Sequence, residues 1–177
     1  MYAQGPAYNN LGTTIGNPMF PNTTSSISNG HNTSAGGSSS WQTFSRMDYN
    51  LQHPSDWTVE PGISGEGIML KPNDGSVLLE FGIHYISMSI PFSKELAFEK
   101  TRLKLTEFDN NTFISGHPAV KIVGIESSGR LQGYEVMILL SQFGGKRYHI
   151  DFNGTPQAYN RYLSTAQQII DSFKTPG

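Results

Sequence analysis

The end of the chain shows the clearest pattern of hydrophobic and polar positions. Four apolar residues recur there at the i, i+3, i+4 and i+7 spacing of one helix face: Ala166, Ile169, Ile170 and Phe173. Ser164, followed three residues later by Gln167, has the arrangement of a capping box, in which two side chains satisfy free N–H groups at a helix start. The pattern predicts an amphipathic helix over residues 164–174 whose apolar stripe must be buried.

Alternating apolar residues predict β-strands in the middle of the chain. In the longest run, residues 76–90, five alternating side chains share one face: Val77, Leu79, Phe81, Ile83 and Tyr85. The apolar positions then change phase to Ile86, Met88 and Ile90, which indicates a bulge or bend. This run is therefore predicted to be a long strand with an irregular end.

Three further strands are predicted in the second half of the chain, over residues 119–125, 134–142 and 147–152. Short turns rich in Gly and Ser join them, and hairpin-like links of this kind predict antiparallel pairing. Before them, Ser93 is placed to cap a helix that extends as far as Phe108.

Two short strands are predicted on either side of a turn near the start of the ordered sequence. Leu51 lies in the first, Pro54-Ser55-Asp56 makes the turn, and Trp57 begins the second. Residues 68–71 form the next apolar run. Together the elements predict an antiparallel sheet covered by helices, an α+β sandwich.

The first 40 residues differ in composition from the rest. They are dominated by Gly, Asn, Ser, Thr and Pro and contain no Asp, Glu, Lys or Arg, so all charged side chains lie later. Sparse apolar residues without a period cannot offset the entropy of ordering the backbone. We predict a disordered, uncharged tail or linker at residues 1–40 and one folded domain at 41–177. A Ser/Thr/Asn-rich segment ahead of a domain is typical of exported proteins.

Composition excludes some functions and leaves others open. The formal net charge is −2 and basic residues do not cluster, so the chain lacks the electrostatic pattern of a nucleic-acid binder. It has no Cys, which excludes disulfides and thiolate metal sites. No run approaches the roughly 18 apolar residues of a membrane span. The N-terminus shows no basic residue followed by an apolar run, so we expect no signal peptide in this sequence.

Several segments together resemble the PsbP-like family, whose founding members are extrinsic subunits of the photosystem II oxygen-evolving complex. The resemblance covers about residues 41–175 and rests on the order and spacing of these segments: Tyr49-Asn50-Leu51 with Pro54-Ser55-Asp56-Trp57, residues 115–121 (SGHPAVK), Gly145-Lys146-Arg147-Tyr148, Tyr159 with Tyr162, and the helix from Ala166 to Lys174. It implies an α/β/α sandwich with a central, mostly antiparallel sheet flanked by helices.

The resemblance also implies a non-enzymatic accessory role. The family includes photosynthetic subunits, assembly factors, and exported or lipid-anchored relatives, and the resemblance leaves calcium-ion binding open at the family level. Photosynthetic members work partly through a charged N-terminal segment, and here an uncharged segment stands in its place. The resemblance therefore implies fold and accessory character and assigns no binding residue.

Candidate chemistry centres on His149 and Asp151. Alternation along a strand puts both on one face, where an imidazole and a carboxylate can share a divalent cation such as Zn²⁺ with a third ligand. A solvated polar face is the alternative interpretation. Glu80 and His84 share a face in the same way. No Gly-x-Ser-x-Gly motif or paired base indicates a nucleophile.

Three functions are consistent with the sequence. The first is a non-enzymatic accessory or binding domain, extracytoplasmic or extrinsic to a membrane, carried by a flexible N-terminal stalk and contacting a protein or membrane-complex partner. The second is a metal-binding protein or small metal-assisted hydrolase using His149 and Asp151. The third is a structural surface protein, favoured if all four Asn-x-Ser/Thr sequons carry glycans: Asn22, Asn32, Asn110 and Asn153. The first requires no cofactor.

Overall fold

The computed structural model describes residues 40–62, 67–85 and 90–175. They lie in one compact unit that spans Gly37–Gly177. The predicted tail, apart from Ser40, lies outside the described residues, as do the sequons at Asn22 and Asn32. The predicted change of phase at Ile86 and Met88 also lies outside them.

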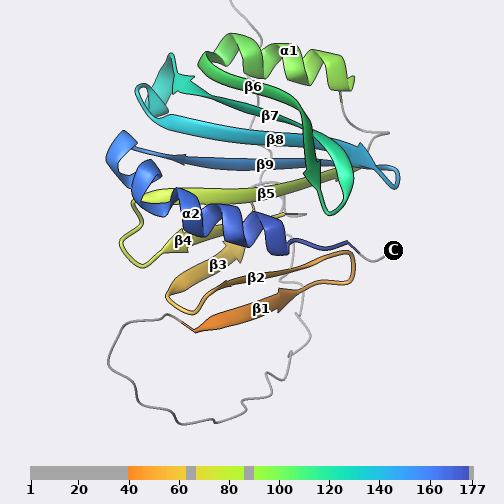
Figure 1. Cartoon of the computed structure of the whole chain (residues 1–177), viewed down its shortest axis with the longest axis vertical. Coiled ribbons are helices and arrows are strands. Elements are labelled where there is room, and N and C mark those ends of the chain that lie inside the picture. Colours follow the sequence, from red (N-terminus) through yellow and green to blue (C-terminus); the bar gives the residue numbers. More distant parts are fainter. Residues whose placement is uncertain (1–39, 63–66, 86–89, 176–177) are drawn as a thin grey trace, which may run out of the picture. The chain divides into compact units, whose positions relative to one another are not determined.

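A seven-stranded sheet forms the centre of this unit, in the order β3-β4-β5-β9-β8-β7-β6 (Figure 1). Each neighbouring pair of strands is antiparallel. The strands are β3 (Trp57–Pro61), β4 (Ile68–Pro72), β5 (Val77–Tyr85), β6 (Leu103–Ile114), β7 (His117–Glu126), β8 (Glu135–Phe143) and β9 (Lys146–Gly154). The predicted strands and their antiparallel pairing in the second half of the chain are confirmed.

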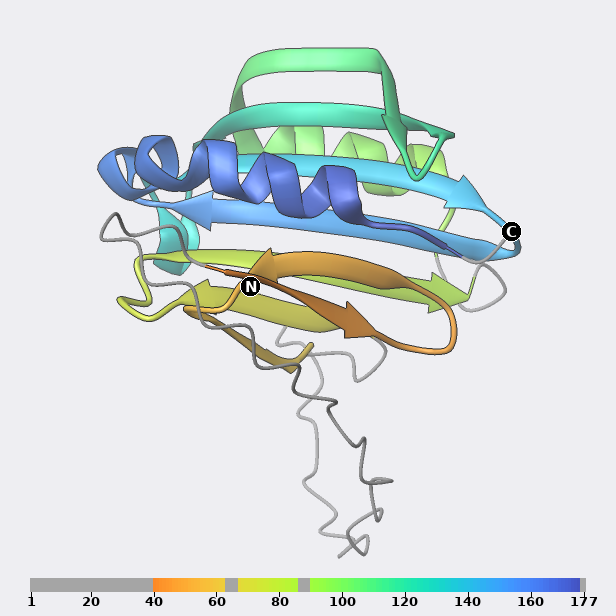
Figure 2. The same cartoon turned by 60° about the horizontal axis from the view of Figure 1, so that its bottom comes forward.

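The two helices cover opposite faces of the sheet (Figure 2). Helix α2 (Pro156–Ser172) packs its Ala166, Ile169 and Ile170 against apolar side chains of β5, β8 and β9. Helix α1 (Phe92–Arg102) lies over a second apolar cluster, formed by β6, β7 and β8. Because β8 is buried on both faces, its residues Val136–Leu140 form an unbroken apolar run. The α+β sandwich expected from the sequence is confirmed.

A separate hairpin, β1 (Trp41–Ser45) with β2 (Asn50–Pro54), is joined to the C-terminal end of α2. Asn50 and Lys174 exchange two backbone hydrogen bonds of 2.9 and 2.8 Å. Just inside this bridge, the Phe173 ring contacts the rings of Tyr49, Phe81 and Tyr148. The C-terminal segment therefore ties the hairpin to the main sheet through one aromatic cluster.

Some predicted boundaries are wrong. Pro91, not Ser93, is the N-cap of α1, and the helix ends at Arg102. The residues predicted to continue it to Phe108 belong to β6, where pairing with β7 overrides local preference. The Trp57 strand pairs with β4 and not with the Leu51 strand.

The predicted start of the last helix, at residue 164, is also wrong. Helix α2 begins eight residues before Ser164, at Pro156, and Thr155 is its N-cap, accepting a hydrogen bond from the Ala158 N–H. Proline suits this first position, since its missing N–H would have no partner there. Ser164 and Gln167 therefore lie inside the helix, where Gln167 donates to Asp171 at 2.8 Å.

The buried Tyr159 of α2 should make the free energy of unfolding depend on pH. Burial, followed by the charges of Glu135 and Glu107, raises the pKa of Tyr159 to about 12. An unfolded tyrosine has a pKa of about 10, so between these values the folded state keeps a proton that the unfolded state loses. The free energy of unfolding should therefore fall as pH rises from 10 to 12.

Urea denaturation of the wild type and Tyr159→Phe across this pH range measures the effect. The variant should show a shallower decline, since it lacks this phenol. Tyr49, Tyr148 and Tyr162, whose pKa values are also raised, contribute equally to both proteins. Identical slopes would contradict the assignment.

Candidate functional site

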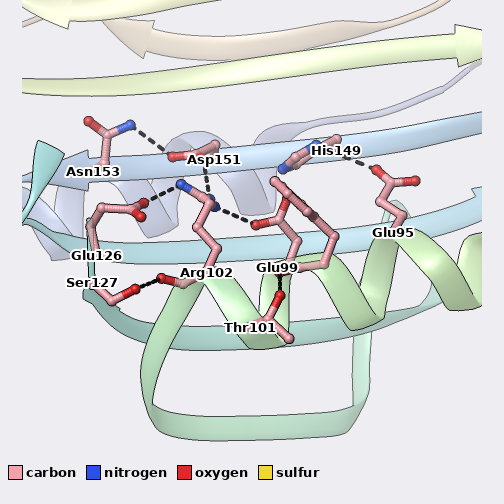
Figure 3. A network of polar contacts seen from close by, with 10 residues as sticks. Glu95, Glu99, Thr101, Arg102, Glu126, Ser127, His149, Asp151 and Asn153 are labelled. Atoms are coloured by element: carbon pink, nitrogen blue, oxygen red, sulfur yellow. Dashed lines mark hydrogen bonds and ion pairs between the residues drawn. The ribbon is translucent and has the colours of Figure 1, made fainter. Parts of the chain in front are cut away.

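His149 and Asp151 lie on the face of β9 that is turned towards α1 (Figure 3). Their side chains are 24% and 19% exposed, so this face is largely covered. The two residues share a face as alternation predicts, and that face is more covered than the alternative interpretation of a solvated polar face implies. The strand contributes two more polar side chains to the same face, Arg147 and Asn153.

Arg102, the last residue of α1, is the centre of one group of polar contacts. Its guanidinium lies 2.8 Å from the Glu99 carboxylate and 2.5 Å from that of Glu126, which is at the end of β7. The third contact is to Asp151, at 3.5 Å. Asn153 donates to the other oxygen of Asp151 at 2.8 Å. One cation thus joins α1, β7 and β9.

Arg147 forms a second group, next to the first. Its side chain is only 2% exposed and donates to Glu95 at 2.7 Å, to Gln142 at 2.9 Å and to the backbone oxygen of Ile90. The other Glu95 oxygen lies 3.6 Å from Nδ1 of His149. Glu95 therefore connects two residues of β9 to the first half of α1.

Ion pairs hold helix α1 against the polar face of β9. Burial disfavours the charge of Arg102, but the hydrogen bond and charge of Glu99, with the charges of Asp151 and Glu126, raise its pKa above the usual value. Glu99 and Glu126 are themselves 4% and 5% exposed. A buried carboxylate is stable only when it is paired, so these ion pairs fix the position of α1.

Two buried nitrogens have no hydrogen-bond partner among the described residues, Nε of Arg147 and Nε2 of His149. Within the same residues, no three His, Asp or Glu side chains are arranged to hold a metal ion. Nδ1 of His149 faces Glu95, and both oxygens of Asp151 have partners. The divalent-cation site at His149 and Asp151 stays a prediction.

The other residues considered as candidate ligands lie at several places in the fold. Glu80 and His84 face α1 beside β9, opposite Asp151 and Arg147 in the strand register. His53 is buried in β2, and the His117 ring stacks on that of Phe143 at 3.7 Å. Glu107 pairs with Lys121 at 2.9 Å.

Asn153 bears on the third function that the sequence left open. The residue is 7% exposed and hydrogen-bonds Asp151, so a glycan cannot be attached to it in this fold. Occupancy of all four sequons, which would favour a structural surface protein, is therefore inconsistent with the structure.

Sequence reasoning missed Arg102, Glu99 and Glu126. No spacing marks them, because they come from the end of a helix and the end of a strand 24 residues apart. The only local signal is the Glu99–Arg102 spacing, which brings two side chains together on a helix. That spacing lies within the predicted helix, but by itself it does not indicate that Glu126 and Asp151 meet the same guanidinium.

Comparison with solved structures identifies the fold. The solution structure of cyanobacterial PsbP (CyanoP) from Synechocystis sp. PCC 6803 aligns with 82% of this chain and 98% of its own, at a TM-score of 0.59 and 11% identity. The chain has the PsbP-like fold. At this identity the similarity concerns the fold alone.

Two other solved structures align more weakly. The Ran-binding protein Mog1p of Saccharomyces cerevisiae covers 77% of this chain and 95% of its own, with a TM-score of 0.49 and 7% identity. LpqN of Mycobacterium tuberculosis, involved in cell envelope biogenesis, covers 78% and 91%, with a TM-score of 0.46 and 14% identity. No family model and no curated protein matches the sequence.

The Arg102 contacts generate a stability prediction. Arg102→Met should lower the free energy of unfolding by about 3–5 kcal/mol, because Glu99 and Glu126 would stay buried without a counter-charge. Adding Glu99→Leu and Glu126→Leu should restore most of this loss. Urea denaturation measures both effects.

The matched control is Arg161→Met, which removes an exposed ion pair with Asp74. Its two side chains are 69% and 40% exposed, so the loss should stay below about 1 kcal/mol. If Arg102→Met costs no more than this control, the contacts under α1 do not anchor the helix.

The predicted cation site has its own test. Calorimetric titration with Zn²⁺, Mn²⁺ and Ca²⁺ should give a binding heat that His149→Ala abolishes, since the imidazole would be a direct ligand. Lys71→Ala, at a site remote from His149 on β4, should leave the heat unchanged. No heat at millimolar metal would refute the site.

Proposed function

We propose that this chain is a non-enzymatic accessory domain that binds a partner protein, in an extracytoplasmic setting or extrinsic to a membrane, and is presented by its uncharged N-terminal segment. The observation that carries the proposal is the exposed edge strand β6. It is the last strand of the sheet and pairs on one side only, with β7. It runs for 12 residues with two irregularities, between Leu105 and Glu107 and between Asp109 and Thr112, so the opposite side offers backbone groups in short stretches.

Three large apolar side chains project from β6 on the side that faces α1. Leu105, Phe108 and Phe113 are 40%, 43% and 59% exposed. The strand register places Phe108 opposite Ile122, which is part of the apolar cluster beneath α1. These side chains therefore continue the α1-side core onto the surface. We call Leu105, Phe108, Phe113 and the free backbone beside them the β6 edge.

The chemistry of the β6 edge suits an extended segment of another protein. Such a segment can add to an exposed strand, where main-chain hydrogen bonds provide affinity and side-chain contacts provide specificity. The Lys100 ammonium lies 3.8 Å above the Phe108 ring, and Lys104 is exposed on the other face. The ion pairs among the described residues involve neither lysine. We therefore expect a partner segment with apolar residues flanked by acidic ones.

The hydrolase alternative has less support. His149 and Asp151 contact Glu95 and Arg102, and these contacts join α1 to the sheet.

Among the described residues no helix is both long and apolar enough to cross a membrane.

Photo-crosslinking in cells that express the chain naturally tests the proposal. With p-benzoylphenylalanine at position 108, we expect an adduct with one defined protein. The matched control places the same residue at Thr58, which is exposed on β3 at the opposite edge of the sheet. Leu105→Asp should abolish the adduct and leave thermal unfolding unchanged, because its side chain is 40% exposed.

An adduct of equal yield at position 58, or no adduct at position 108, would refute the β6 edge as the docking surface. An adduct with a second copy of the chain would refute the proposal that the β6 edge binds a different protein, since the edge would then join two copies. Fractionation of the same cells reports the compartment, and recovery entirely in the cytosol would contradict the extracytoplasmic part.

A further inference from the structure

A groove lies on the opposite side of the sheet, between α2 and the strands β6, β7 and β8. Its volume is about 630 Å³, within the range of sites that hold small molecules. Helix α2 packs mainly on β2, β5, β9 and β8, which leaves the end of this face towards β6 and β7 without a helix over it. The groove therefore exists because α2 covers only part of this face of the sheet, and no loop forms it.

The floor of the groove is apolar. Val123 of β7, Met137 of β8 and Leu163 of α2 line it. Met137 is 1% exposed, while Val123 and Leu163 are half-buried. An apolar ring or chain placed here would remove Val123 and Leu163 from water, which favours binding in proportion to the area covered, whereas Met137 is already buried.

The α2 side of the rim presents hydrogen-bond acceptors. The amide nitrogens of three residues are already used inside the helix: Asn160 donates to Pro156 at 2.8 Å, Gln167 to Asp171 at 2.8 Å, and Gln168 to Ser164 at 3.3 Å. Each amide therefore keeps its carbonyl oxygen and one N–H for another molecule. Groups of this kind suit a ligand with hydroxyl groups, which both donate and accept hydrogen bonds.

Tyr159 adds a donor at the same place. The residue lines the groove and is 5% exposed, and its hydroxyl has no hydrogen-bond partner among the described residues. Burial and the charges of Glu135 and Glu107 raise its pKa, so the hydroxyl keeps its proton at all ordinary pH values. This hydroxyl is not one of the fully buried polar atoms without a partner, so it is open to the groove and can donate to a bound acceptor in place of water.

The groove offers no free charge. Glu107 and Lys121 are its only charged lining residues, and they pair with each other at 2.9 Å. A charged ligand entering the groove would lose hydration without gaining a counter-charge. This argument excludes carboxylates, phosphates and amines as preferred ligands.

We propose that this groove binds an uncharged small molecule that has hydroxyl groups on one side and an apolar ring face on the other. A glycoside and a phenolic alcohol both have this chemistry. The site is independent of the β6 edge, because it lies on the other face of the sheet and uses different residues.

An NMR titration of ¹⁵N-labelled protein tests the proposal with matched probes. Phenyl β-D-glucoside and 4-hydroxybenzyl alcohol are the two neutral probes, and they distinguish the two sources of hydroxyl groups. The charged analogues are 4-hydroxybenzoate and tyramine. We expect at least one neutral probe to shift amides of α2 and β7 around the groove, with at least tenfold tighter binding than either charged analogue.

Two variants localise the binding. Ser164→Trp fills the groove and should abolish the shifts, whereas Gln157→Trp, exposed on the first turn of α2 and outside the groove, should not. Tyr159→Phe removes only the hydroxyl and should weaken binding about fivefold. The proposal is overturned by shifts that persist in Ser164→Trp, by charged probes binding as tightly as neutral ones, or by no shift at tens of millimolar probe.

Discussion

The structure depends on the two different faces of strand β9. This strand is the middle one of seven, so both of its faces are covered. Tyr148, Ile150 and Phe152 point into the core under α2, while the alternate positions from Arg147 to Asn153 are polar and meet α1. A polar face at the centre of a sheet is stable only if its charges are paired. Helix α1 supplies those pairs through Glu95 and Arg102, and Glu99 in turn pairs with Arg102 within the helix.

This constraint separates the roles of the two helices. Helix α2 contributes a broad apolar stripe and closes the larger core cluster. Helix α1 contributes a few apolar residues, Phe92 and Leu96 among them, and is held largely by ion pairs. While its acidic side chains turn inwards, the outer surface of α1 keeps Lys94 and Lys100 exposed, and Lys100 lies over Phe108 of the β6 edge. The pairing under α1 thus shapes the charge of the surface next to the proposed docking strand.

The two faces of the sheet then offer different kinds of contact. On the α1 side, β6 exposes apolar side chains and an unpaired backbone, which suits a protein segment. On the α2 side, the helix leaves part of β7 and β8 uncovered and forms a groove with neutral polar walls. Strand β6 belongs to both surfaces, with Phe108 on one face and Glu107 on the other. The two faces of the sheet therefore present two unlike surfaces.

Short-range sequence patterns were sufficient to predict a helix or a strand where the burial of one apolar face was the main requirement. The apolar stripe from Ala166 to Phe173 falls on one face only if the segment is a helix. The alternating apolar residues of β5 and β9 fall on one face only if those segments are strands. The shared face of His149 and Asp151 followed in the same way. The helix starts could not be located reliably, since Ser93 and Ser164 resemble caps that the chain does not use. Thr155 and Pro156, the actual start of α2, were not recognised as a helix start.

The sequence by itself determined the class of fold, the antiparallel pairing of the later strands and the residues that share a strand face, because these depend on periodicity and short turns. Only the tertiary structure decided what covers each face. The ion pairs of Arg102 join residues 99, 126 and 151, and the groove joins α2 to strands far from it in the chain. Such contacts depend on the order of strands in the sheet, and no local pattern of residues encodes that order.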